Sequence, residues 1–347
     1  MFRATSRTRI APRWVALPLI GIVIALSACS AAPAAPIATP APTTPATPTL
    51  VGPQTLSTLI DLPPESPQLE YLDEVESVAG ETATQVAYSS GGSRVTGVLR
   101  VPAGEGPFPA VVVVHGSTDP ETYETGGDLI PEQRGLLDAG FAVFALDLRG
   151  YADSAPADTA ALGIDPGFGW VTTLDWAMAL DVANGLQALR TGDVPTVDAD
   201  RVGLLGHSLG GLLVLDAAVI APGASDLVVA LSAAPSDLGA ALDEIREARP
   251  DLAEEFDFSG TPAADPGYWA EVSPRGYFDR VTEPLLMIHG SADDTTDPQW
   301  SRDTVEAWAA TGNRAEFFAI EGGDHHFRPA RADEVAMTVA AFEAVLG

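Results

Sequence analysis

Two kinds of segment alternate along most of the chain. Continuous apolar runs such as FPAVVVVHGS at 108–117 are typical of strands buried on both faces of a sheet. Segments such as DPQWSRDTVEAWAATG at 297–312 have the spacing of amphipathic helices and end at a glycine. The expected strands are 82–90, 93–103, 108–117, 141–150, 201–206, 226–233, 283–291 and 314–320, and the expected helices are 127–140, 172–191, 208–223, 297–312 and 332–346. Because strands and helices alternate from about residue 111 onward, we expect an α/β fold with a mostly parallel central sheet and helices on both of its faces.

The alternation lapses late in the sheet, between the strands expected at 226–233 and 283–291. The intervening sequence is acidic, partly helical in pattern and aromatic near its end. We expect a small cap insertion at about 233–282, lying over the carboxyl edge of the sheet and shaping a pocket. The alternative is a surface excursion without a role in binding.

The N-terminal segment 1–29 has the three parts of a secretory signal. Four arginines within the first 13 residues precede the apolar stretch WVALPLIGIVIAL, and LSAC follows at 26–29. LSAC resembles the signal box of bacterial lipoproteins, in which the cysteine becomes the lipidated first residue, so Cys29 is the expected lipidation site. We therefore expect an exported protein of the cell envelope, lipid-anchored to the outer face of a bacterial membrane. A plain signal peptide or an uncleaved membrane anchor is the alternative.

A Pro/Ala/Thr-rich stretch separates this signal from the rest of the chain. The run SAAPAAPIATPAPTTPATPTLVGP has no apolar periodicity, so we expect 30–54 to be a disordered tether. The folded domain is then expected at 55–347.

Charge narrows the classes of partner. The 347 residues include 48 acidic and 18 basic side chains, all of the latter arginine, and the net charge is −30 at pH 7. No basic stripe is available to neutralise phosphates, which excludes a nucleic-acid partner. The same charge disfavours anionic membrane surfaces and strongly anionic substrates, so contact with a membrane is expected through the N-terminal lipid alone. Cys29 is the only cysteine, so no intrachain disulfide can form.

The segment GHSLG at 206–210 fits the pattern G-x-S-x-G between a strand and a helix. A serine on such a sharp turn stands in a strained backbone conformation, and bulky neighbours would collide there. Ser208 is therefore the expected nucleophile, with a structural turn residue as the alternative. The backbone N–H groups of Ser117 and Leu209 are the expected oxyanion hole, with Thr118 as the alternative to Ser117.

A serine nucleophile needs a base and an acid, and both are found after later strands. SADDTTDP follows the strand at 283–291, and Asp293 is preferred as the acid, with Asp294 and Asp297 left open. GGDHHF follows the last strand, and His325 is preferred as the base, with His326 as the alternative.

The three other histidines are expected to be structural. His115 precedes the expected oxyanion loop and is expected to shape it. His207 lies beside the nucleophile but is expected to point away from it. His289 ends a strand and is expected to pack near the acid loop.

Taken together, GHSLGG, VVVVHGS, FALDLRGYADS, SPRGYFDRVTEPLLMIHGSADD and EGGDHHF resemble the α/β-hydrolase superfamily over about residues 80–347. The segment at 273–294 is most similar to prolyl-oligopeptidase-like and dienelactone-hydrolase-like members. The resemblance implies Asp293 as the acid, four residues after the strand-end histidine, and His325 as the base. The chain departs from these relatives in having TTDP after the acid and an esterase-like elbow.

Three functions compete at this point. The preferred one is a serine hydrolase that cleaves carboxylic esters, or thioesters or amides, through an acyl-enzyme. The second is an exported prolyl-oligopeptidase-like peptidase acting on short peptides, and the third is a non-catalytic envelope binding lipoprotein on a hydrolase scaffold. The expected partner is a small-molecule or short-peptide acyl substrate. No metal-ligand spacing and no dinucleotide fingerprint is present, so no cofactor is implied.

Overall fold

The structure is a computed structural model that describes residues 55–62, 65–156, 177–248 and 262–347. The chain separates into two units, residues 1–46 and residues 47–347, and all described residues belong to the second. The expected signal and tether, the start of the helix expected at 172–191 and the middle of the expected cap lie outside the described residues.

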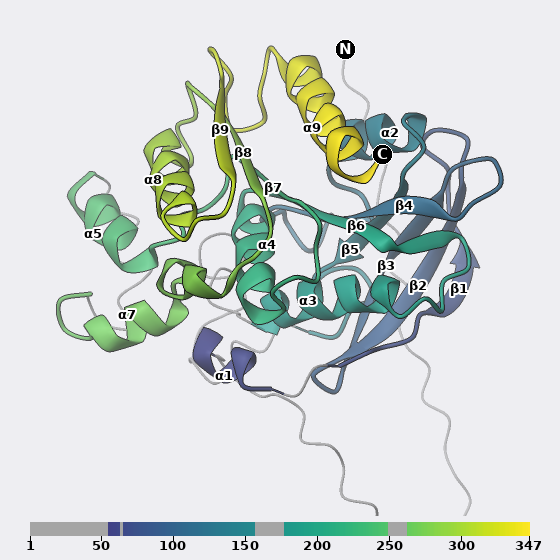
Figure 1. Cartoon of the computed structure of the whole chain (residues 1–347), viewed down its shortest axis with the longest axis horizontal. Helices are drawn as coiled ribbons and strands as arrows, with labels where there is room; N and C mark the ends of the chain where they lie inside the picture. The colour runs from purple at the N-terminus through teal and green to yellow at the C-terminus, as the bar shows by residue number, and fades with distance from the viewer. Residues whose placement is uncertain (1–54, 63–64, 157–176, 249–261) are drawn as a thin grey trace, which may run out of the picture. The chain divides into compact units, whose positions relative to one another are not determined.

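A nine-stranded sheet forms the centre of the described chain (Figure 1), with the strand order β1-β2-β3-β5-β4-β6-β7-β8-β9. Its strands are β1 (Glu70–Glu74), β2 (Thr82–Ser90), β3 (Ser93–Val101), β4 (Phe108–Val114), β5 (Ala142–Asp147), β6 (Val197–His207), β7 (Val228–Leu231), β8 (Leu285–Gly290) and β9 (Ala315–Ile320). The six strands β4 to β9 pair in parallel with one another. Strands β1, β2 and β3 pair in antiparallel fashion, and β3 joins the parallel part by an antiparallel pairing with β5. This is the α/β-hydrolase arrangement, and the expectation of a mostly parallel sheet is confirmed.

Helices lie between the parallel strands, and one further helix precedes the first strand and another follows the last. They are α1 (Leu56–Ile60), α2 (Ile130–Asp138), α3 (Ala177–Arg190), α4 (Leu209–Ile220), α5 (Leu238–Ala248), α7 (Pro266–Val272), α8 (Pro298–Ala309) and α9 (Arg331–Leu346), with the 3-10 helix η4 (Pro274–Arg280) before β8. None of the helices in the described part of the chain has both the length and the apolar character needed to cross a bilayer.

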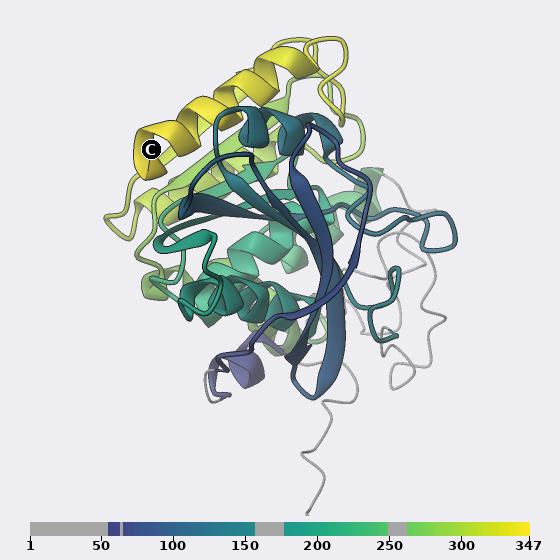
Figure 2. The same cartoon turned by 90° about the vertical axis from the view of Figure 1, so that its right-hand side faces the viewer.

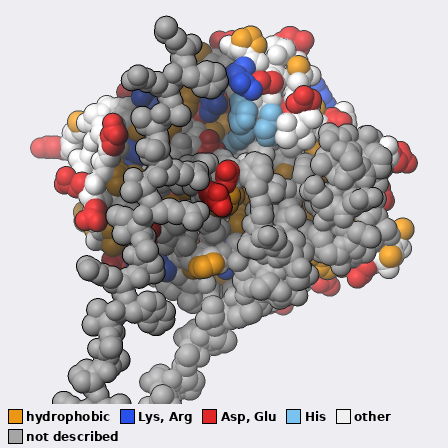
Figure 3. All heavy atoms as spheres, turned by 180° about the vertical axis from the view of Figure 1, so that it is seen from behind, with side chains coloured by type: hydrophobic (Ala, Val, Ile, Leu, Met, Phe, Trp, Pro, Cys, Tyr) orange, Lys and Arg blue, Asp and Glu red, His pale blue; other side chains and the backbone are white. Residues whose placement is uncertain are grey.

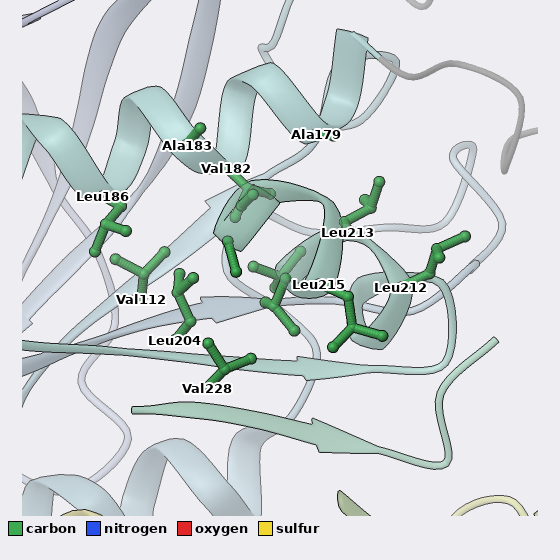
Figure 4. Packing of buried hydrophobic residues seen from close by; sticks show 14 of the residues in the cluster. Val112, Ala179, Val182, Ala183, Leu186, Leu204, Leu212, Leu213, Leu215 and Val228 are labelled. Atoms are coloured by element: carbon green, nitrogen blue, oxygen red, sulfur yellow. The ribbon is translucent and has the colours of Figure 1, made fainter. Parts of the chain in front are cut away.

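Each face of the sheet has its own hydrophobic core, and β4 contributes to both. Successive side chains of a strand point to opposite faces, so Val112 and Val114 belong to one core and Val111 and Val113 to the other. The first core lies under α3, α4 and α8, where Leu204 of β6 and Val228 of β7 pack beneath the helices (Figure 4). The second lies under α2 and α9, on the opposite side of the sheet in Figure 2.

Two elements of the structure were not among those expected. Strand β1 carries the sequence EYLDE and is almost wholly exposed at the edge of the sheet, so it lacks an apolar run. Helix α1 has only five residues, and Leu56 and Leu59 are buried in the first core.

The segment between β7 and β8 is helical where the structure describes it. It contains α5, α7 and η4, and α5 and α7 contact one another (Figure 1). These helices occupy the range in which the cap was expected.

The parallel arrangement brings several loops to the same edge of the sheet. The loops that follow β4, β6, β8 and β9 all leave at the carboxyl ends of their strands, which is where α/β sheets bind ligands. These loops carry the residues singled out from the sequence.

Candidate active site

Ser208 lies at the sharp turn between β6 and α4. Its backbone has φ 55° and ψ −116°, a region that costs free energy for a residue with a side chain. Its N–H donates to the carbonyl of Leu231 at 2.9 Å, and its carbonyl accepts from the N–H of Ala234 at 3.0 Å. Bonds to the end of the neighbouring strand therefore hold the strained turn in place.

The two glycines of the elbow are required by close contacts. A side-chain carbon at Gly206 would collide with the carbonyl oxygen of Gly210, and one at Gly210 would collide with the carbonyl oxygen of Val114. The G-x-S-x-G pattern is thus a steric requirement of the way β6 turns into α4 beside β4.

Asp293 and His325 meet across the ends of β8 and β9. The His325 Nδ1 lies 2.8 Å from Asp293 Oδ2, and the Asp293 side chain is fully buried while that of His325 is 11% exposed. The N–H groups of Thr295 and Thr296 donate to Asp293 Oδ1 at 2.8 and 3.0 Å. The carboxylate is therefore held with one oxygen toward the imidazole.

The charge of Asp293 is stabilised by its hydrogen bonds. Burial alone would raise the pKa of Asp293, but bonds from His289 and His325 outweigh burial and hold the pKa well below its usual range. Asp293 is a carboxylate throughout the neutral range and can stabilise a protonated His325.

His207 links the base to the elbow. Its Nε2 lies 2.8 Å from the carbonyl oxygen of His325, and the centroids of the two rings are 4.8 Å apart. Burial and the neighbouring His325 lower the pKa of His207 to about 4, so its ring is neutral near pH 7. The expectation that His207 is structural fits this contact, and its ring packs against the loop that carries the base.

The loop after β4 passes directly against the elbow. A side-chain carbon at Gly116 would lie 3.3 Å from Ser208 Cβ. The Gly116 N–H is already taken, because it donates to Asp128 Oδ2 at 3.1 Å. Ser117 comes next in the loop, and Leu209 is the first residue of α4, where amide groups have no acceptor within the helix. Both expected oxyanion donors therefore lie in backbone that adjoins Ser208.

Further side chains hold this loop. The Tyr151 hydroxyl donates to the Thr118 carbonyl at 3.1 Å and hydrogen-bonds to the side chain of Ser117. His115 Nδ1 lies 2.7 Å from the Gly116 carbonyl, and its Nε2 accepts from the Leu148 N–H at 3.2 Å. His115 shapes the loop, as expected. Sequence reasoning missed Tyr151 and Asp128, because only the fold brings these side chains to the loop.

The alternative acids and the alternative base lie elsewhere. Asp294 is exposed, and Asp297 caps α8 by accepting from the Gln299 N–H at 2.8 Å. His326 is exposed at the surface, while its neighbour His325 hydrogen-bonds to Asp293. Figure 3 shows where histidine side chains come to the surface, beside arginine and acidic side chains.

The cap region contains a hollow of about 500 Å³ between α5 and α7, lined by residues that include Asp237, Trp269, Ser273 and Arg275. Among the described residues, no group of His, Cys, Asp and Glu side chains has the geometry of a metal site. Cys29 lies outside the described residues.

Two family models and one curated relative match parts of the chain. A model of the prolyl oligopeptidase family matches residues 174–346, and a model of the acetyl xylan esterase family matches residues 64–233. Esterase EstD of Thermotoga maritima is 27% identical over 221 residues, which cover 57% of this chain and 49% of the relative. The chain thus spans about half the length of this curated relative.

Two solved structures illustrate the range of similar folds. The acetyl xylan esterase of Paenibacillus sp. R4 has a TM-score of 0.62 at 20% identity, over 82% of this chain and 92% of that one. The acylaminoacyl peptidase of Pyrococcus horikoshii has a TM-score of 0.56 at 19% identity, over 81% of this chain and 42% of that one.

Proposed function

We propose that the protein is a serine esterase of the α/β-hydrolase superfamily, which cleaves carboxylic esters through an acyl-enzyme. The observation that carries the proposal is the geometry around one sheet edge: a serine on a strained elbow, with a buried carboxylate bound to a histidine in the adjoining loop. A structural turn residue would have no need of this buried pair.

Each group has one role in the proposed reaction. Ser208 attacks the ester carbonyl, and His325 takes the hydroxyl proton and returns it to the leaving alcohol. Asp293 holds the Nδ1–H tautomer of His325 and stabilises its protonated form. The N–H groups of Ser117 and Leu209 stabilise the negative charge that develops on the carbonyl oxygen.

An ester is favoured over a peptide as the substrate. The acetyl xylan esterase model covers the segment that contains both the loop after β4 and the elbow, and EstD is an esterase by name. We therefore propose short acyl esters of small alcohols or sugars as the first substrates to examine. The prolyl oligopeptidase match over 174–346 favours a short-peptide substrate as the second candidate.

The proposal is tested with purified protein and a p-nitrophenyl acetate assay. Ser208→Ala should lower kcat/KM by at least about 10³-fold, since removing the nucleophile leaves only residual stabilisation by the rest of the site. A fluorophosphonate probe should label the wild type and leave Ser208→Ala unlabelled. Equal hydrolysis by both proteins would remove Ser208 from the mechanism. A wild type that the probe leaves unlabelled would favour the non-catalytic binding lipoprotein. Faster cleavage of aminoacyl-anilides than of esters would favour the peptidase.

We also propose that the protein is exported and lipid-anchored through Cys29. The support is the order of basic, apolar and small residues before this cysteine, followed by the Pro/Ala/Thr-rich stretch. In a bacterial host fed an alkyne-tagged fatty acid, the wild type should carry the label and sediment with membranes. Cys29→Ser should lose the label, and its labelling to the wild-type level would contradict the proposal.

A further inference from the structure

The acid of the site lies against a second imidazole, which approaches the same carboxylate oxygen as the base. We propose that His289 is a positioning residue that acts through Asp293 and sets the negative charge which Asp293 presents to His325. This inference rests on the proposed function, because it concerns the acid and base of the same site.

The geometry is a chain of side chains through the acid. His289 Nε2 lies 3.1 Å from Asp293 Oδ2, the same oxygen that lies 2.8 Å from His325 Nδ1. His289 is fully buried near the end of β8 and precedes Asp293 by four residues in the sequence. The two imidazoles therefore share one carboxylate oxygen.

The other ring nitrogen fixes which proton His289 carries. Its Nδ1 lies 2.7 Å from the Ser301 hydroxyl, and Ser301 is itself buried in α8. The Nε2 lies 3.1 Å from the Thr296 carbonyl oxygen as well as 3.1 Å from Asp293 Oδ2. We assign the neutral tautomer with hydrogen on Nε2, because Ser301 can then donate to Nδ1 while the Nε2–H is shared between the Thr296 carbonyl oxygen and Asp293 Oδ2. The Thr296 hydroxyl also donates to Asp293 Oδ2, at 2.9 Å.

A donor on this oxygen changes what His325 experiences. The hydrogen bond from His289 draws negative charge from Asp293, so the carboxylate is a weaker partner for the protonated imidazole than it would be alone. The backbone N–H groups of Thr295 and Thr296 hold the other oxygen and keep the carboxylate oriented when His289 is replaced. Losing the His289 donor should therefore strengthen the attraction between Asp293 and a protonated His325, while Asp293 stays in place.

The charged and titratable groups around the pair are few in the described residues. Asp293 faces His289 and His325, and the ring of His325 packs against those of His207 and His326. His207 and His326 remain unchanged in all the variants below, so they contribute equally to each profile.

The test compares the pH dependence of kcat/KM for His289→Leu and His289→Gln with that of the wild type. Catalysis needs a neutral His325, so the acid limb of the profile reports its pKa in the free enzyme. His289→Leu removes the donor and should move this limb up by roughly half to one pH unit. His289→Gln keeps an N–H close to the position of Nε2 and should leave the limb near that of the wild type.

Two further variants separate this role from a general loss of packing. Ser301→Ala removes the hydroxyl at Nδ1 and should move the limb in the same direction by a smaller amount. Thr304→Val, one turn further along α8, removes a buried hydroxyl that bonds to Ser236 and to the Trp300 carbonyl, and should leave the limb unmoved. Titration with a fluorophosphonate gives the fraction of active sites in each variant. Partial misfolding lowers this fraction, and with it the height of the pH–rate profile, but does not move the acid limb along the pH axis.

An acid limb in His289→Leu that stays in place or moves to lower pH would overturn the proposal. Failure of the proposed function is a separate result, in which wild type and Ser208→Ala hydrolyse esters equally. In that event the pKa of His325 is read by NMR of histidine-labelled protein, with His325→Gln to assign the signal. The same upward shift in His289→Leu is expected there, and its absence would overturn the inference.

Discussion

Three aspartates within five residues have different environments in the loop after β8. Asp293 is buried against two imidazoles, Asp294 is exposed, and Asp297 caps α8. The sequence favoured Asp293 and the resemblance implied the same residue, but Asp294 and Asp297 stayed open because all three side chains follow the same strand. Burial and hydrogen bonding separate them, and neither property can be read from the spacing.

These environments predict opposite consequences for two substitutions. Asp293→Asn should lower kcat by about 10²–10⁴-fold, since an amide can hold His325 in the wrong tautomer. Asp297→Ala should leave kcat near the wild-type value and lower the free energy of unfolding by about 1 kcal/mol, because an N-cap is lost. Ester hydrolysis and urea denaturation measure the two effects, with Asp294→Asn as the exposed control. Loss of activity in Asp297→Ala, with an active Asp293→Asn, would reverse the assignment of the acid.

Helices α2 and α9 are joined at their N-terminal ends by a buried cluster of charged side chains. Arg331 donates to both oxygens of Glu132 at 3.0 and 2.8 Å, and the Glu132 side chain is fully buried. Glu334, also buried, accepts from the Thr338 hydroxyl at 2.8 Å, while its other oxygen faces no donor among the described residues. Burial and the Glu132 carboxylate raise the pKa of Glu334 to about 9.

This raised pKa predicts how the stability of the fold depends on pH. Glu334 keeps its proton in the folded state where the unfolded chain has released it, so its contribution is present at low pH. That contribution is lost as the pH rises above the unfolded pKa toward the folded one. Glu334→Gln should therefore stabilise the protein at about pH 8 more than at about pH 5, by roughly 2–4 kcal/mol.

Chemical denaturation at the two pH values measures this difference. Thr338→Val is the comparison variant, because it removes the hydroxyl that lowers the pKa of Glu334 and keeps the carboxyl group itself. Its stability should therefore still fall between the lower and the higher pH. A stability gain from Glu334→Gln that is the same at both pH values would contradict the raised pKa.

Across the whole molecule, the elements that the sequence predicted are those that leave a pattern in a short stretch of neighbouring residues. The strands with continuous apolar runs, from β4 to β8, are where they were expected, because burial on both faces leaves a clear signal. Strand β1 was missed since an exposed edge strand needs no apolar residues. The strand-to-helix turn at Ser208 was recognisable because the glycines it requires are adjacent in the chain.

The remainder of the site depends on contacts between distant segments. Asp128 reaches Gly116 from the start of α2, and His325 meets Asp293 from a loop 32 residues further along the chain. His289 was expected to pack near the acid loop, yet its hydrogen bond to the carboxylate had no local pattern. Such polar contacts follow from the fold, and any one of them could be absent without changing the apolar pattern.

Strand β9 closes one side of the sheet, and its outer edge is where another polypeptide could add itself. Phe318 in this strand is 43% exposed, and an exposed apolar side chain on an edge strand favours association with another chain. The neighbouring Arg314–Glu316 pair, at 2.7 Å, and the Arg302 guanidinium, 4.1 Å from the centre of the Phe317 ring, keep full charges along it. Hydrated charges oppose the edge-to-edge association of identical molecules. Arg302, Arg314 and Glu316 should therefore help to keep this protein from aggregating in concentrated solution.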